Sequence, residues 1–343
     1  MIALISGITG QDGYYLTKFL LEKGYIVWGM IRKTSAPTKT QYIDSFKGPN
    51  LFLRHGDLAE GNTIVNILRE IHEKYPDMER LEVYNLGALT HVGLSFEMPE
   101  YTANINGLGV LRFLEAIRNS GFMHKIKFYQ ASTSELFGKV VETPQTETTP
   151  LYPRSPYGIA KQYAFWLTRN YREAYNMFAC NGILYNHESP YRNEVFATRK
   201  ITLGLSDIIH NRADKLVLGN IYASRDMGHA RDYVKGMWLM MQQEVPDDYI
   251  LCTNETHTIK EFVEKAFKLK GFDIKWKGEG LEEIGYDCIT GRELIFISEE
   301  FFRPTEVDIL LGDNTKASTI LGWQYECTFE KLIEEMVEHD CKK

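Results

Sequence analysis

The stretch Ile2-Ala3-Leu4-Ile5-Ser6-Gly7-Ile8-Thr9-Gly10-Gln11-Asp12-Gly13 decides the fold. Its first five residues form a short, continuous apolar run, as expected for a parallel strand that is covered on both faces. Glycines at 7, 10 and 13 follow, and a helical pattern of apolar residues comes next. Between a strand and a helix, glycines let the backbone approach a pyrophosphate at the helix N-terminus. The stretch therefore predicts a dinucleotide-binding turn; the alternative is a glycine-rich turn that binds nothing.

The alternation of strand and helix continues downstream. Gly24 ends the first helix, and residues 25–31 have the pattern of a second strand. Such alternation predicts right-handed βαβ units and an α/β fold with a doubly wound, parallel Rossmann-type sheet. Further strands are expected at 51–54, 82–86, 126–131 and 179–184, with helices at about 61–74, 100–119 and 157–176.

The pattern changes after residue 186, where arginines, prolines and aromatic residues become mixed into loops. We therefore expect a nucleotide-binding domain over 1–186 and a smaller C-terminal α+β substrate domain over 187–343. The chain is expected to rejoin the sheet near 231–253. Helical patterns recur near 197–211, 258–270 and 328–338, and residues 32–49 are predicted to form a long loop.

Composition excludes several classes of function. The 343 residues are 44% hydrophobic and 25% charged, and the net charge is −7, so no global basic field attracts nucleic acid or a membrane. The five cysteines are scattered without a CxxC pair, which predicts neither a metal site nor a disulfide framework. With a first strand that begins at Ile2 and no long apolar run, we expect a cytoplasmic, reduced protein.

The end of the second strand indicates which nucleotide binds. The strand runs into Met30-Ile31-Arg32-Lys33-Thr34-Ser35, with two cations and no acid. A 2′-phosphate requires arginine, whereas a free 2′-hydroxyl prefers an acid at this point, so the sequence favours NADP over NAD. The alternative is a solvated basic turn. Asp57-Leu58 and Leu86-Gly87-Ala88 end the next two strands, where this fold places the adenine and the nicotinamide-side ribose.

Residues 132–161 carry the predicted chemistry. Thr133 and Glu135 follow the strand at 126–131, at the edge of the sheet where ligands bind. Tyr157 and Lys161 are four residues apart and share one helix face, so the ammonium should lower the pKa of the phenol toward working pH. A phenolate can then take a proton from a sugar hydroxyl.

Glu135 is the unusual member of this group. Oxidation at carbon needs only Tyr, Lys and a hydroxyl, so an additional carboxylate suggests a second proton transfer, from carbon. Helix capping explains the residue equally well. Ordinary packing is the alternative for Tyr157, although Pro156 marks a helix start, and Lys161 could be a solvated side chain.

Arginine-bearing loops in the second half could bind a diphosphate. Arginine forks suit phosphate oxygens, and an acidic protein needs such local clamps. Taken singly, each of these arginines is more commonly a surface residue. The segments are 186–192, 224–226 and 302–306.

Together these blocks resemble the GDP-mannose 4,6-dehydratases of the extended short-chain dehydrogenase/reductase superfamily. The glycine loop and the Tyr/Lys pair are common to the superfamily, whereas the other blocks are more specific. The matching blocks are GITGQDG at 7–13, SFEMPEYTANINGLG at 95–109, YQASTSELFG at 129–138, PRSPYGIAKQYA at 153–164, NHESPYR at 186–192, TRKI at 198–201, RDMGHARDYV at 225–234 and FFRPTEVDILLGD at 301–313.

The resemblance implies roles for individual residues. The implied catalytic residues are Thr133, Glu135, Tyr157 and Lys161. The implied NADP contacts are Gly7, Thr9, Gly10, Gln11, Asp12, Gly13, Arg32, Asp57, Leu58, Leu86, Gly87, Ala88, Tyr101, Tyr157, Lys161, His187 and Arg192. The implied contacts to the GDP-sugar are Asn186, Lys200, Arg225, Arg303 and Glu306.

The resemblance also implies an activity and an assembly. GDP-D-mannose would become GDP-4-keto-6-deoxy-D-mannose by internal hydride transfer through bound NADP, with loss of water. Tyr157 would deprotonate the C4 hydroxyl while Thr133 bonds the same oxygen, and Glu135 would remove the C5 hydrogen and assist departure of the C6 hydroxyl. A homodimer or homotetramer is implied, in which the loop after the second strand meets a neighbouring cofactor site. Lys33 departs from the second arginine of the family, which puts the tetramer contacts in doubt.

Other readings stay open at this point. A nucleotide-sugar epimerase or reductase could use the same scaffold, and added NADPH could further reduce the 4-keto product. A non-catalytic NADP-sensing protein is a third class, although all four catalytic positions are intact.

Overall fold

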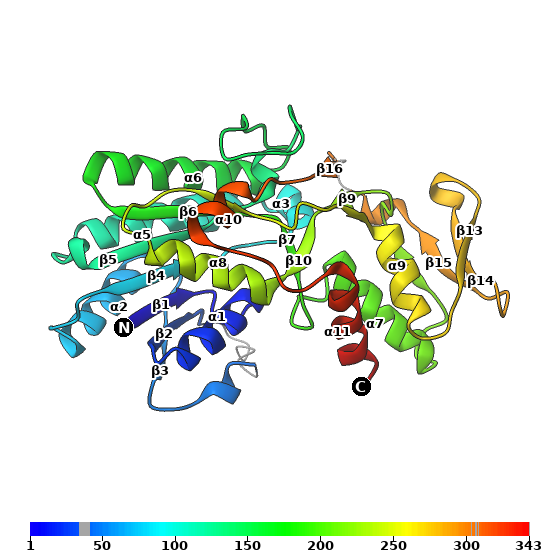
Figure 1. Cartoon of the computed structure of the whole chain (residues 1–343), viewed down its shortest axis with the longest axis horizontal. Helices are drawn as coiled ribbons and strands as arrows, with labels where there is room; N and C mark the ends of the chain where they lie inside the picture. Colours follow the sequence, from blue (N-terminus) through cyan, green and yellow to red (C-terminus); the bar gives the residue numbers. More distant parts are fainter. Residues whose placement is uncertain (34–41, 303, 306, 308, 343) are drawn as a thin grey trace.

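The fold is that of a computed structural model, which describes residues 1–33, 42–302, 304, 305, 307 and 309–342. Within these residues a seven-stranded parallel sheet has the order β11-β6-β5-β4-β1-β2-β3 (Figure 1). The order runs outward in both directions from β1, which confirms the doubly wound Rossmann-type fold class. The strands are β1 (Ile2–Ser6), β2 (Ile26–Ile31), β3 (Leu51–His55), β4 (Leu81–Asn85), β5 (Ile126–Ala131), β6 (Phe178–Leu184) and β11 (Tyr249–Leu251).

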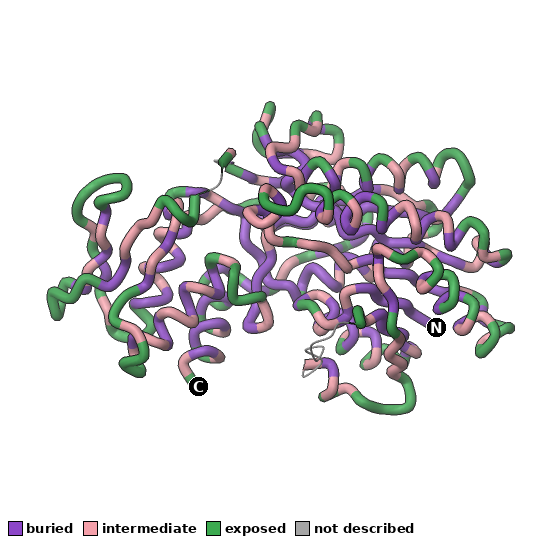
Figure 2. The backbone as a smooth tube through the Cα atoms, turned by 180° about the vertical axis from the view of Figure 1, so that it is seen from behind, coloured by how far each residue is buried: buried purple, intermediate pink, exposed green. Residues whose placement is uncertain are grey.

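The apolar run of β1 feeds a core on each face of the sheet. Ile2 and Leu4 belong to the core on one face, and Ala3 and Ile5 belong to the core on the other. Successive strand residues point to opposite faces, so a strand that is covered twice must be apolar throughout. One face is covered by α2 (Gly61–Lys74), α5 (Gly109–Arg118) and α6 (Pro156–Tyr175), and the other by α1 (Gln11–Glu22) and α8 (Ala230–Gln242). Figure 2 shows the resulting buried layer.

The predicted helix at 100–119 is divided into three parts. It consists of α4 (Pro99–Ala103), a π-helical turn over Asn104–Leu108 and α5. Within the turn, the Asn106 side chain accepts a hydrogen bond from the Leu89 amide (2.8 Å) and donates one to its carbonyl (2.9 Å). This side chain holds the loop that follows β4, which is one way in which a π-turn serves a site. The single-helix prediction was therefore wrong in this detail.

A second region lies beyond the sheet and has a core of its own. Its four-stranded sheet has the order β13-β14-β15-β8; α7 packs against β8, α9 packs against β13, and α11 packs on both helices (Figure 1). The predicted helices near 197–211, 258–270 and 328–338 are confirmed, with ends shifted by up to three residues. The elements are α7 (Ala197–Ile209), α9 (Ile259–Lys268), α11 (Phe329–Cys341), β8 (Leu216–Leu218), β13 (Ile274–Lys277), β14 (Ile284–Asp287) and β15 (Glu293–Ile297).

Short strands connect the two regions. The strand β7 (Asn186–Glu188) follows β6 and pairs in parallel with β10 (Met227–His229). The strand β9 (Ser224–Arg225) lies between β12 (His257–Thr258) and β16 (Ile309–Leu310). The chain returns through α8, which packs on α1, and through β11, which pairs with β6.

Two searches of the described residues returned nothing. No helix among them is long and apolar enough to cross a membrane. No group of three or more His, Cys, Asp or Glu side chains among them could hold a metal ion.

Candidate active site

The glycine loop between β1 and α1 brings two backbone segments into contact. Gly7 has a φ of +68°, and a Cβ at this position would lie 2.8 Å from the Gly87 amide nitrogen and 2.9 Å from the Leu86 carbonyl carbon. Gly10 is the N-cap of α1, and no side chain caps that end in the described structure. The first-turn amides of a twelve-residue helix are therefore available to an anion. This cradle fits the pyrophosphate of a dinucleotide.

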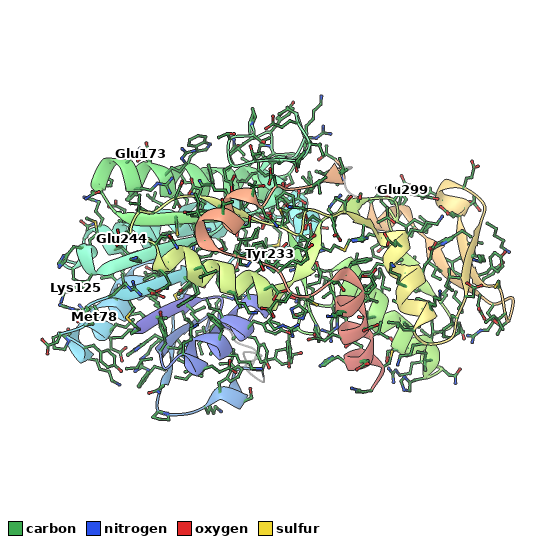
Figure 3. All side chains as sticks on the ribbon, viewed as in Figure 1. Met78, Lys125, Glu173, Tyr233, Glu244 and Glu299 are labelled. Carbon is green, nitrogen blue, oxygen red and sulfur yellow. The ribbon has the colours of Figure 1, made fainter. Side chains whose placement is uncertain are left out.

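Side chains of the loop are held by the segment that follows β6. The Gln11 side chain donates a hydrogen bond to the His187 carbonyl (3.0 Å) and accepts one from the Ser189 hydroxyl (2.7 Å). The Asp12 carboxylate lies 2.9 Å from His187 Nε2. His187 also stacks on Tyr233, which Figure 3 labels on α8. Gln11 and Asp12 thus bind the glycine loop to His187 of β7 and to Ser189 just after it.

The Asp12–His187 pair is an ion pair by its electrostatics. Burial opposes ionisation of Asp12, but the charges of His187 and Arg192 and the bond to His187 together lower its pKa. Burial also opposes protonation of His187, but the charge of Asp12 outweighs it and raises the pKa of the imidazole. Each group thus favours the charged form of the other, beside the glycine loop.

Other predicted cofactor contacts lie at the same edge of the sheet. Arg32, at the end of β2, donates a hydrogen bond to the Tyr101 hydroxyl of α4 (2.8 Å). The Asp57 carboxylate accepts one from the Ala59 amide (2.9 Å), which shapes the turn after β3. Leu58 lies against Gly87, at 3.1 Å from the position a Cβ would take there. Thr34 and Ser35, used in the argument for NADP, lie outside the described residues.

Tyr157 and Thr133 meet at the carboxyl end of β5. Ser155 caps α6 by accepting a hydrogen bond from the Gly158 amide (3.0 Å), and Pro156 begins the helix, as predicted. The Tyr157 amide donates to the Ser95 hydroxyl of α3 (Val92–Glu97) at 3.2 Å. The Thr133 side chain lowers the pKa of the Tyr157 phenol, which places the two side chains near each other. Both predicted residues therefore face one point.

Lys161 is buried and is not a solvated lysine. Its ammonium donates a hydrogen bond to the Ala131 carbonyl at the end of β5 (2.9 Å). It lies 5.8 Å from the centroid of the Tyr157 ring, one turn along the helix. The geometry of the pair is therefore as expected.

The acidity of Tyr157 differs from the sequence prediction. Burial raises the pKa of its phenol to about 12, the Thr133 side chain lowers it, and the charge of Glu135 raises it further. Burial also lowers the pKa of Lys161 to about 8, against the attraction of Asp12. The expected drop in the Tyr157 pKa is therefore wrong for the protein by itself, because desolvation and the charges of two acids exceed the lowering by Thr133 and Arg192.

Glu135 lies next to the phenol. It is buried in the short 3-10 helix Ser134–Leu136, and its charge acts on Tyr157. The side chain that caps this helix is that of Thr133, which accepts a hydrogen bond from the Glu135 amide (3.2 Å). Thr133 therefore caps this helix, and the charge of the Glu135 carboxylate raises the pKa of the Tyr157 phenol.

The residues predicted to bind the sugar nucleotide lie in the second region and in the short strands that connect it to the first. Asn186 is in β7, and Lys200 of α7 holds its ammonium 3.3 Å from the centroid of the Phe301 ring. Arg225 is buried in β9, where its guanidinium donates to the Ser224 carbonyl (2.9 Å). Lys200 therefore contacts Phe301, at one end of the segment 301–310, and the strand that contains Arg225 pairs with β16, at the other end. Arg303 and Glu306 lie outside the described residues.

Sequence reasoning missed several polar residues that support this edge of the sheet. The Ser6 hydroxyl donates to Asn85 (2.5 Å) and accepts from the Gly87 amide (3.0 Å), and Asn85 donates to Gln130 (2.8 Å). These side chains stand at the ends of three neighbouring strands. The detectable signal is a polar residue at the end of each otherwise apolar run, because parallel strands bring such positions together.

The fold and site define a class of protein: a Rossmann-type protein with a glycine-rich turn that fits a dinucleotide. Residues 4–336 match the family model described as GDP-mannose 4,6 dehydratase. The chain therefore belongs to the GDP-mannose 4,6-dehydratase family.

Individual relatives agree with this assignment. The chain is 53% identical to the GDP-mannose 4,6 dehydratase of Dictyostelium discoideum, over 99% of this chain and 95% of that protein. It is 51% identical to the GDP-mannose 4,6-dehydratase of Sinorhizobium fredii, over 99% and 96%.

Solved structures share the fold. The dTDP-glucose 4,6-dehydratase of Bacillus anthracis, in complex with NAD, matches with a TM-score of 0.78 at 21% identity, over 99% of this chain and 96% of that one. The protein titled RMD from Pseudomonas aeruginosa, complexed with NADPH, matches with a TM-score of 0.75 at 18% identity, over 100% and 99%.

Proposed function

We propose that this chain converts GDP-D-mannose to GDP-4-keto-6-deoxy-D-mannose, with loss of water, as an NADP-dependent hydro-lyase. The observation that carries the proposal is the meeting of Thr133, Tyr157 and Glu135 at one end of β5, in the electrostatic field of Asp12. An alcohol oxidation needs the first two groups, and Glu135 adds a base for a proton on carbon. Membership of the family supplies the substrate.

The proton transfers are divided between two residues. Tyr157, beside Thr133, takes the proton of the C4 hydroxyl, and Lys161 stabilises the charge that forms. A 4-ketone acidifies the neighbouring C5 hydrogen, which Glu135 removes. The protonated Glu135 then donates to the departing C6 hydroxyl, and Tyr157 returns a proton to C5. The nicotinamide, when bound, supplies hydride acceptance and return.

NADP is the proposed cofactor, for which Arg32 is the support. Its guanidinium lies at the end of β2 beside Tyr101, where a 2′-phosphate on the adenine ribose would meet a cation. The glycine loop at residues 7–13, together with His187, would hold the rest of the dinucleotide. Comparison of NADPH and NADH affinities for the wild type and for Arg32→Ala tests this assignment, since loss of discrimination is expected.

The region that contains α7, α9 and α11 is the proposed sugar-nucleotide domain. We assign residues 187–343 to it, apart from the return through α8 and β11, and residues 1–186 to the NADP-binding domain. The separate core around α7 and α9 supports this division. Asn186, Lys200, Arg225, Arg303 and Glu306 are the proposed contacts to the GDP-sugar.

An apolar stripe on α6 supports assembly into a homodimer or homotetramer. Ile159, Tyr163 and Trp166 recur at helical spacing and are 58%, 45% and 51% exposed. Leu108 of the adjoining π-turn is exposed beside them. Large apolar side chains gathered in this way mark a protein interface more often than a solvent-facing surface.

A cytoplasmic location is also proposed. Cys180, Cys252 and Cys327 are buried free thiols, and burial raises the pKa of each. Such thiols are common in proteins of reducing compartments. Cell fractionation with an antibody against the chain tests the location.

The activity is tested by incubating the purified protein with GDP-mannose, UDP-glucose and dTDP-glucose. Of these three sugar nucleotides, we expect only GDP-mannose to give a 4-keto product. When the reaction runs in D2O, this product should carry deuterium at C5. A C4 epimer without C5 deuterium would replace the proposal with an epimerase. A parallel reaction with added NADPH shows whether the ketone is also reduced.

The role of Glu135 is tested by Glu135→Gln. The variant should bind NADPH as the wild type does and lose about 10²- to 10⁴-fold in kcat, since a general acid–base group is removed. Glu173→Gln, at the exposed end of α6, is the matched control (Figure 3). Normal turnover in Glu135→Gln removes this carboxylate from the mechanism.

A further inference from the structure

Two consecutive residues of the TRKI block, Thr198 and Arg199, both hold the segment that carries Arg192. Neither residue has a role in the proposed chemistry. Arg192 is a proposed cofactor contact, and its charge acts on both Asp12 and Tyr157. Its placement therefore affects the cradle and the catalytic phenol together.

Thr198 holds the side-chain partner of Arg192. The Arg192 guanidinium forms an ion pair with the buried Glu188 carboxylate (3.0 Å) and lies 3.7 Å from the centroid of the Phe196 ring. The same carboxylate oxygen of Glu188 accepts a hydrogen bond from the Thr198 hydroxyl (2.6 Å). The direction of the Arg192 side chain is thus fixed through Glu188.

Arg199 holds the backbone of the same segment. The residue is 3% exposed, and its guanidinium donates hydrogen bonds to the carbonyls of Pro190 and, at 3.3 Å, Arg192. Two carbonyls on one turn are held by one rigid, planar donor group, which restricts the turn more than separate lysine contacts could.

The C-terminal helix holds Arg199 in turn. Asp340 of α11 is 1% exposed and faces the Arg199 guanidinium with both oxygens, at 2.7 and 2.8 Å. Thr202 donates to the same carboxylate (2.7 Å), and His339 Nδ1 lies 3.0 Å from it. A buried carboxylate with this many partners keeps the guanidinium in one orientation.

We infer that Arg199 is a positioning residue that acts through Arg192, and that Asp340 couples the C-terminal helix to the cofactor site through it. The inference rests on the proposed role of Arg192 in cofactor binding. If the Arg199–Asp340 ion pair served only to hold α7 against α11, Arg199 would not need its hydrogen bonds to the carbonyls of Pro190 and Arg192.

The test is a double-mutant cycle on NADPH affinity, measured by cofactor fluorescence at a temperature where circular dichroism shows each variant to be folded. Arg199→Lys and Asp340→Asn should each weaken NADPH binding at least about tenfold, the change that corresponds to one charge-assisted hydrogen bond. Glu330→Gln, which breaks the exposed Lys265–Glu330 pair of the same helix, should leave the affinity unchanged.

The double-mutant cycle distinguishes a role of Arg199 in positioning Arg192 from a role only in holding α7 against α11. If Arg199 acts through Arg192, the Arg192→Ala/Arg199→Lys double variant should bind NADPH no more weakly than Arg192→Ala. Additive losses, or wild-type affinity in the Arg199 and Asp340 variants despite a lower Tm, would overturn the inference. Should Arg199→Lys fail to fold, the same cycle with Asp340→Asn and Arg192→Ala tests the coupling from the other side of the ion pair. Wild-type affinity in Arg192→Ala itself would instead refute the proposed cofactor role of Arg192 and the inference with it.

Discussion

Asp12 of the glycine loop and His187 of β7 lie 175 positions apart in sequence and 2.9 Å apart in space. The pair joins the glycine loop, the proposed pyrophosphate site, to β7, after which the chain enters the second region. A cofactor bound at the proposed site would therefore contact a loop that is already bonded to β7. The pair is ionic, so its strength depends on pH.

The first prediction concerns the pH dependence of this pair. Folding raises the pKa of His187. Its contribution to the stability of the fold is therefore fully present below the unfolded pKa of 6.5 and is lost as pH rises through the folded pKa. The pKa of Asp12 is lowered, so its contribution is full above 3.8 and is lost as pH falls through the folded value. Between those limits Asp12→Asn should cost about 1–3 kcal/mol, and the cost should shrink at alkaline pH.

Thermal unfolding of wild type and Asp12→Asn from pH 5 to pH 9 measures this difference. Glu70→Gln is the control, because it breaks the Arg54–Glu70 ion pair, and neither partner is a histidine. Its effect should stay constant over this range. A constant difference for Asp12→Asn as well would mean that His187 is not the charged partner.

The second prediction concerns the Tyr157–Lys161 pair. With a pKa of about 8, the Lys161 ammonium is present below that pH and is lost above it. Turnover should therefore fall on the alkaline side of about pH 8, because the neutral amine no longer stabilises the phenolate. Lys161→Met should lose about 10²-fold or more in kcat and should lack this limb. An alkaline limb that survives in Lys161→Met belongs to another group.

The central fold could be predicted because its signals are local. The run at 2–6 and the glycines at 7, 10 and 13 specify a covered strand and a close turn, and each depends on neighbours in sequence. The position of Lys161 near Tyr157 likewise follows from helical spacing. These are the parts of the site that the sequence determines by itself.

The remaining parts depend on residues that meet only after folding. The pKa of Tyr157 was mispredicted because its burial, and not Lys161, has the largest effect. The contacts of Arg199 join positions 190–192 and 340, which no spacing rule connects. The π-turn before α5 arises from Asn106 bonding to Leu89 across a loop. Pattern analysis of one sequence contains none of these distances.

The third prediction compares two glycines with a left-handed backbone. Gly24 has a φ of +79° and nothing within 4 Å of the position of a Cβ, whereas a Cβ at Gly7 would meet the backbone at Gly87. Gly24→Ala should cost about 1–2 kcal/mol from backbone strain alone. Gly7→Ala should cost about 1–3 kcal/mol more, because two backbone segments must move apart, and NADPH affinity should fall with it. Equal Tm values and equal affinities for the two variants would show that the cradle tolerates a Cβ.

The fourth prediction concerns the exposed stripe of α6. Tyr157 and Lys161 face the core from this helix, so Ile159, Tyr163 and Trp166 are left on its outer side. Trp166→Glu should place a charge in the proposed interface and shift the assembly toward the 39.6 kDa monomer, while the single-chain fold persists. Light scattering coupled to gel filtration measures the mass, and Val245→Glu, at an exposed position outside the stripe, is the control. Because the stripe lies on the helix that carries Tyr157, the proposed base, loss of the assembly should also lower turnover. A Trp166→Glu protein with the same mass as the wild type would show that this face is not the contact between copies.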